Sequence, residues 1–127
     1  MSLQSRLAEL ITAIGADIKV AKNSITSEAT NAAPIPTGFA QYNQHTITAL
    51  AAAAVLGVPS GTLVNGNRLI IRIKDNGTAR GISYNAVYRA VGVTLPITTV
   101  LSKTLYLGAV YNSTDSRWDI IAVGQEA

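Results

Sequence analysis

The sequence has no cysteine, so disulfide bonds and thiolate metal sites are both excluded. Charged residues are also scarce, at 13% of the 127 residues against a usual share of about 25%. No apolar run approaches the roughly 20 residues that span a bilayer, and the N-terminus lacks a charged segment followed by an apolar one. We therefore expect a protein made in the cytoplasm, without a membrane span and stabilised by packing or assembly. The low charge fits either a surface partly covered by neighbouring molecules or an extracellular binding domain.

The sequence is equally poor in residues that carry chemistry. His45 is the only histidine, and no nucleophile or second ligand accompanies it, so we interpret it as an ordinary histidine at a strand edge. Of the seven acidic residues, only Asp115 and Asp119 are close in sequence, and no glycine-rich phosphate loop is present. We predict no catalytic residue, no metal and no cofactor, and the protein is not expected to be an enzyme.

The net charge of +3 does not by itself indicate nucleic acid as a partner, because the ten basic residues are scattered. Only Arg68, Arg72 and Lys74 lie close together, and on a strand these three side chains share one face. A solvated strand face is the simpler interpretation, with a phosphate-binding stripe as the alternative. Aromatic residues make up 6% of the chain and do not alternate with the basic ones, so nucleic acid is not expected as a partner.

Residues 1–25 have the apolar spacing of a helix, with steps of three and four. Ser2 can cap its first turn. The expected apolar positions are Leu3, Leu7, Leu10, Ile14, Ile18, Ala21 and Ile25.

Residues 26–41 contain Pro34 and Pro36 and many small polar residues, which predicts a linker, although a strand along the body is a possible alternative. From residue 42 onward, β-branched and aromatic residues alternate with polar ones and are separated by turn residues. Asn76-Gly77 and the stretch from Tyr111 to Trp118 both indicate hairpins. About seven short strands over residues 42–127 predict an antiparallel β-sandwich or jelly-roll-like domain, which we call the head.

The predicted helix needs a partner for its apolar face. A linker of this length, with two prolines, is longer than the usual 4 to 6 residues between packed elements. Association with the same helix of other copies, as a coiled coil, is the favoured interpretation. Docking on another protein and folding back onto the head are the alternatives.

Two stretches resemble virion proteins of tailed bacteriophages, particularly those of actinobacterial hosts. "RLAELITAIGADIK" (6–19) resembles a helical leader of such proteins. The order "RLIIRIKDNGTAR", "TLPITT", "LYLGAVYN" and "IIAV" within residues 66–127 resembles the β domain that closes tail fibres and related minor structural proteins. The chain is very short and has no shaft repeats, unlike long tail fibres.

This resemblance implies a homotrimeric virion protein, either a short fibre or a capsid decoration protein, in contact with major capsid or tail proteins. The alternative is a receptor-binding head that recognises host-surface carbohydrate. Its expected contact residues are Asn112, Asp115 and Trp118, although Trp118 also fits a core position.

Overall fold

The computed structural model describes residues 2–21, 25–28, 44–59 and 61–127, with the backbone alone for 15–21 and 25–28. Helix α1 (Leu3–Ala21) precedes strand β1 (Ile25–Glu28). The later strands are β2 (Gln44–Leu50), β3 (Ala54–Leu56), β4 (Arg68–Asp75), β5 (Ile82–Tyr84), β6 (Tyr88–Ala90), β7 (Thr104–Asn112) and β8 (Arg117–Gln125). The described part of the chain is therefore mainly β, as the sequence predicts.

Helix α1 begins where the sequence places its cap. The Ser2 hydroxyl accepts a hydrogen bond from the Ser5 N–H at 3.1 Å, and the Ser2 carbonyl accepts the first helical bond from Arg6. The helix ends at Ala21, earlier than predicted, and Ile25 lies in β1 instead. In β1, Ile25 pairs with Gln44 of β2, so pairing with a distant strand overrides the local helical spacing.

The predicted linker begins in this strand. Its residues 26–28 belong to β1, while residues 29–41 and the boundary with the head lie outside the described residues.

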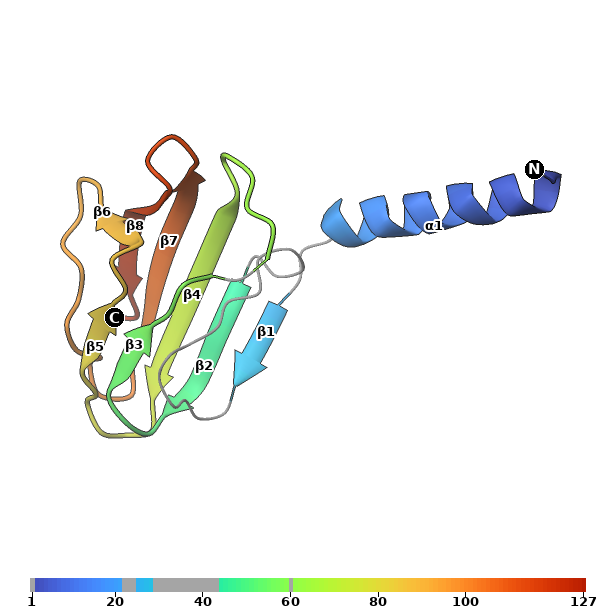
Figure 1. The fold of residues 1–127 in the computed structure, drawn as a ribbon. Helices are drawn as coiled ribbons and strands as arrows, with labels where there is room; N and C mark the ends of the chain where they lie inside the picture. The colour runs from blue at the N-terminus through green and yellow to red at the C-terminus, as the bar shows by residue number, and fades with distance from the viewer. Residues whose placement is uncertain (1, 22–24, 29–43, 60) are drawn as a thin grey trace.

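The strands form a six-stranded sheet in the order β1-β2-β4-β7-β8-β6 and a two-stranded sheet of β3 and β5 (Figure 1). The predicted antiparallel arrangement is wrong for much of the larger sheet. The β1-β2, β2-β4 and β6-β8 pairs are parallel, whereas β4-β7 and β7-β8 are antiparallel. Side-chain alternation is the same in both kinds of pair, so the sequence pattern could not distinguish them.

One face of the larger sheet carries the core. Along β4, Leu69, Ile71 and Ile73 are almost fully buried, while the residues between them are exposed or half-buried. Residues of the smaller sheet, including Leu56 and Ile82, join the same hydrophobic cluster. We call the core-facing side of the six-stranded sheet its inner face and the opposite side its outer face.

Asp75, at the end of β4, anchors the loops that follow it. Its carboxylate accepts hydrogen bonds from the Thr99 hydroxyl at 2.7 Å, the Ser102 N–H at 2.9 Å and the Gly77 N–H at 3.0 Å. Burial raises the pKa of this carboxyl, but these hydrogen bonds and the charge of Arg80 together outweigh burial and leave the pKa below its ordinary value. The group therefore stays ionised in the interior at neutral pH.

The two predicted hairpins have different outcomes. The turn at residues 112–117 does connect the antiparallel pair β7-β8. Gly77 has the expected positive φ of 93°, but the chain leaves β4 there and continues to β5 in the other sheet. Asn76-Gly77 therefore makes a turn without making a hairpin.

Candidate functional site

The described apolar side chains of α1 face solvent. Leu3, Leu7, Leu10 and Ile14 are 82%, 53%, 56% and 48% exposed. The side chains of Ile18 and Ala21 lie outside the described set. Four of the predicted interface residues therefore form an uncovered surface on one helix, to one side of the sheets in Figure 1.

Ile11 belongs to the same surface, although it is not among the apolar positions predicted from the sequence. It lies four residues after Leu7 and three before Ile14, and it is 63% exposed. A helix of 3.6 residues per turn places it on the same face as both. The signal was present in the sequence as the apolar pair Leu10-Ile11, which broadens the stripe to a face.

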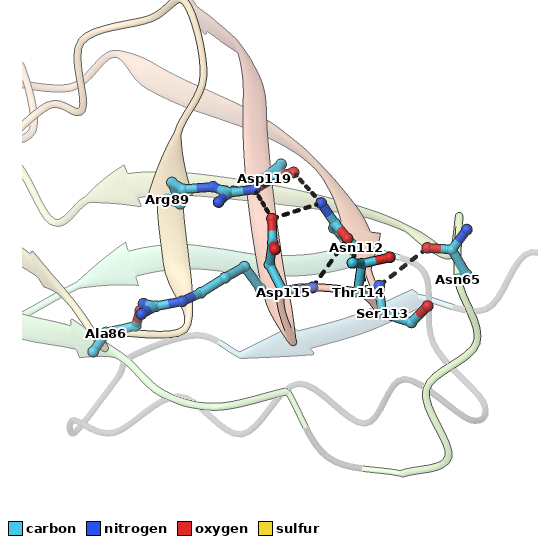
Figure 2. Close-up of polar contacts among 9 residues, drawn as sticks. Asn65, Ala86, Arg89, Asn112, Ser113, Thr114, Asp115 and Asp119 are labelled. Atoms are coloured by element: carbon cyan, nitrogen blue, oxygen red, sulfur yellow. Dashed lines mark hydrogen bonds and ion pairs between the residues drawn. The ribbon is translucent and has the colours of Figure 1, made fainter.

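A second candidate site lies at the turn between β7 and β8. Four side chains, Arg89, Asn112, Asp115 and Asp119, form what we call the polar cluster (Figure 2). Arg89 of β6 contacts Asp119 of β8 through two hydrogen bonds of 2.7 and 3.0 Å, and Asp115 of the turn at 2.9 Å. The Asn112 amide donates to both carboxylates, at 3.1 and 3.4 Å.

The turn that presents this cluster is held from within and from a neighbouring loop. The side-chain oxygen of Asn112 accepts hydrogen bonds from the N–H groups of Thr114 and Asp115. Ser116 has a positive φ of 53°, which helps the chain reverse into β8. The Ser113 N–H donates to the side chain of Asn65 at 3.0 Å, which ties the turn to the loop before β4.

The electrostatics of the cluster favour the ionised form of Asp119. The bond from Arg89 holds the pKa of Asp119 below its ordinary value, although partial burial opposes the effect. The same bonds raise the pKa of Arg89, first through Asp119 and then through Asp115. Because the Arg89 guanidinium is shared by both acids, the arrangement joins β6 to β8.

The structure brings only two of the three predicted receptor contacts to the surface. Asn112 and Asp115 meet in the polar cluster, and the Asp115 side chain is 45% exposed. Trp118 is 1% exposed and packs in the core, with its ring 5.3 Å from that of Tyr111. An exposed Trp118 contact is therefore wrong, because alternation along β8 directs this side chain inward.

A hollow lies beside the polar cluster, at the point where the turn meets the loop before β6. It has a volume of about 350 Å³ and is lined by Ala86, Val87, Asp115, Ser116 and Arg117. The Arg117 guanidinium donates to the Ala86 carbonyl at its edge. Neither this hollow nor the role of Arg89 could be found from the sequence, because both depend on the parallel pairing of β6 with β8.

A third candidate is the outer face of the larger sheet. The alternating burial along β4 places Arg68, Ile70, Arg72 and Lys74 on this face, as predicted for the three basic residues. We call Arg68, Arg72 and Lys74 the basic stripe. Among the residues that the structure describes, both ion pairs involve Arg89, so the stripe has no ion-paired acid there.

The remaining features of the described residues concern His45, metal ligands and membrane-spanning helices. His45 is 1% exposed in β2, between β1 and β4, so its interpretation as a strand-edge residue is wrong. No cluster of three or more histidine and acidic side chains suited to a metal ion occurs in the described ranges. Within those ranges, no helix combines the length and apolarity needed to cross a membrane.

The chain was compared with known proteins at three levels. It matches no model of a protein family, no curated protein sequence and no solved structure.

Proposed function

We propose that this protein is a non-enzymatic structural component of a bacteriophage virion, either a short fibre or a capsid decoration protein. Three copies associate through α1, and each carries a β-rich head that projects from the particle. The head is a sandwich-like arrangement in which the two sheets enclose one core. Major capsid or tail proteins are the expected neighbours of the assembled trimer.

The observation that carries the association is the uncovered apolar face of α1. Its five described members are each at least 48% exposed in the single chain. Burying a leucine or isoleucine side chain contributes about 1.5–3 kcal/mol, so covering such a face on several helices outweighs a substantial entropic cost. Equivalent faces of identical helices are complementary to one another, because leucine and isoleucine at a and d positions pack knobs into holes.

The oligomeric state tests the proposal. Sedimentation equilibrium at micromolar concentration is expected to give three times the chain mass of 13.3 kDa. Leu10→Asp is expected to dissociate the trimer, because it places an unpaired charge in the seam.

Thr12→Asp is the matched control, because Thr12 is exposed and lies on the opposite side of the helix from Leu10 and Ile14. It introduces the same charge and is expected to leave the mass unchanged. A monomeric wild-type protein would contradict the proposal, and so would a trimer that survives Leu10→Asp.

A receptor-binding head is the second candidate function. It is favoured by the exposed Asp115 and the hollow beside it, where carboxylate and amide groups could bind sugar hydroxyls. It lacks the expected stacking surface, since Trp118 is buried. Glycan-array binding that is lost in Asp115→Ala would support this function, whereas an array without signal favours decoration.

A further inference from the structure

The basic stripe on the outer face plays no part in the proposed association through α1, and its side chains line one face of β4. Alternate residues of a strand lie about 7 Å apart on one face, so Arg72 and Lys74 are neighbours and Arg68 lies about 13 Å from Arg72. Arg68 and Lys74 are exposed, and Arg72 is half-buried. The stripe therefore presents a line of positive charge along most of β4.

Arg72 is held in place at the centre of this line. Its guanidinium lies 5.2 Å from the ring centroid of Tyr106, the residue that pairs with it on β7. A cation above an aromatic ring is stabilised by the charge distribution of the ring, so this guanidinium loses less freedom when it binds an anion. Tyr106 remains 40% exposed and extends the same surface.

On one side of the stripe, β7 and then β8 carry small residues at several positions of the outer face. Gly108 pairs with Ile70, Ala122 pairs with Gly108, and Gly124 pairs with Tyr106. None of these three residues has a side chain larger than a methyl group, so a chain-like ligand can approach the backbone next to β4. Ile70 lies 46% exposed between Arg68 and Arg72 and offers an apolar contact within the charged line.

Among the side chains that the structure describes, no acidic group forms an ion pair with the stripe. Asp115 and Asp119 are engaged with Arg89, and Asp75 is buried on the inner face. Glu126 lies near Lys74 and Lys103, and its pKa is lowered first by the Thr104 N–H and to a smaller degree by these lysines. Glu126 thus offsets part of the positive charge at the Lys74 end of the stripe.

We propose that the outer face of the six-stranded sheet binds an anionic polysaccharide, which lies along β4 with its carboxylate or sulfate groups on Arg68, Arg72 and Lys74. Charge complementarity identifies the ligand as a polyanion. A single-stranded nucleic acid fits less well, because its bases need successive aromatic platforms. Among the described residues, Tyr106 is the only ring beside the stripe, and Arg72 already covers it. This site does not depend on the association of α1.

Binding of heparin, a sulfated polysaccharide, to the full chain tests the proposal by titration calorimetry over a series of salt concentrations. The wild type is expected to bind, and its affinity should fall with salt because bound counterions are released. The triple variant R68Q/R72Q/K74Q is expected to lose about tenfold or more in affinity at low salt. Its slope of log affinity against log salt should fall by about one for each basic side chain in contact.

A matched pair of single variants separates the site from net charge. Arg72→Gln and Arg6→Gln each remove one positive charge, the first from the stripe and the second from α1. Only Arg72→Gln is expected to weaken binding. Fluorescence of Trp118, the one tryptophan of the chain, is a check that each variant keeps its core.

Three results would overturn the proposal. The first is an absence of heparin binding at low salt, and the second is equal weakening by Arg6→Gln and Arg72→Gln. The third is tighter binding of a thymidine oligonucleotide than of heparin, which would assign the face to nucleic acid. A trimer that fails to bind heparin contradicts only this site, whereas a monomer that binds heparin contradicts only the assembly.

Discussion

Helix α1 and the six-stranded sheet use the same apolar residues in opposite ways. Leu107 of β7 is 1% exposed, whereas Leu10 of α1 is 56% exposed. The sheet covers one of its faces with elements from its own chain, but the described part of the chain supplies nothing that covers the apolar face of α1. The difference separates a region that buries its apolar side chains within one chain from a helix whose apolar face no described residue covers.

The largest expected effect comes from truncating one leucine in each region. Leu107→Ala should lower the free energy of unfolding of the head by about 2–5 kcal/mol, because it leaves a cavity in the core. Leu10→Ala should leave that value unchanged and instead weaken association. Urea unfolding followed by Trp118 fluorescence measures the first effect, and sedimentation measures the second. Equal losses of head stability in the two variants would show that α1 packs on the head.

Asp75 gives the next largest effect, because a buried carboxylate with three donors is difficult to replace. Asp75→Asn should destabilise the head by about 1–3 kcal/mol at pH 7, since an amide presents donors to groups that themselves donate. The pKa of Asp75 is lower in the folded state than its ordinary value of 3.8. Its contribution is therefore complete above that value and is lost as the pH falls below it toward the folded pKa.

Urea titrations at several pH values between 7 and 3 measure this contribution. The wild type should lose stability at the acidic end more steeply than Asp75→Asn, while Leu10→Ala serves as a control with the wild-type slope. Parallel curves for the wild type and Asp75→Asn would contradict the assigned hydrogen bonds.

The smallest effect is expected in the polar cluster, whose side chains are partly exposed to solvent. Arg89→Gln should destabilise the head less than Asp75→Asn does, because solvent screens exposed ion pairs. It should also raise the pKa of Asp119 toward its ordinary value, since Arg89 is the main cause of the present lowering. Carboxyl carbon chemical shifts measured by NMR across an acidic titration report this change directly. An unchanged Asp119 titration would show that the ion pair does not form in solution.

Sequence reasoning predicted the elements better than their pairing. The cap at Ser2, the β-rich character, the β7-β8 hairpin and the shared face of the basic stripe all follow from local spacing and residue type. Parallel pairing does not, because strands of either orientation alternate in the same way. The end of α1 was predicted too late in the chain. Ile25 pairs with Gln44 of β2, and local periodicity carries no information about such a distant partner.

The candidate sites divide along the same line. The apolar face of α1 was predictable because every member lies within one helix, apart from the omission of Ile11. Sequence reasoning identified two members of the polar cluster, Asn112 and Asp115, because they belong to one turn. It missed Arg89, which comes from a strand 26 residues before Asp115. Trp118 could not be placed with certainty from its neighbours, because an aromatic residue of a strand fits either face until the register is known.

The position of β8 in the larger sheet has a consequence for the order of folding. β8 follows β7 in the chain and pairs with it locally, but it also separates β7 from the earlier strand β6. During synthesis β6 leaves the ribosome before its neighbour exists, so it has no edge on which to pair until β8 has docked. We expect the β7-β8 hairpin to be the early nucleus, and the Arg89 bond to Asp119 to form only in the final closure of the sheet.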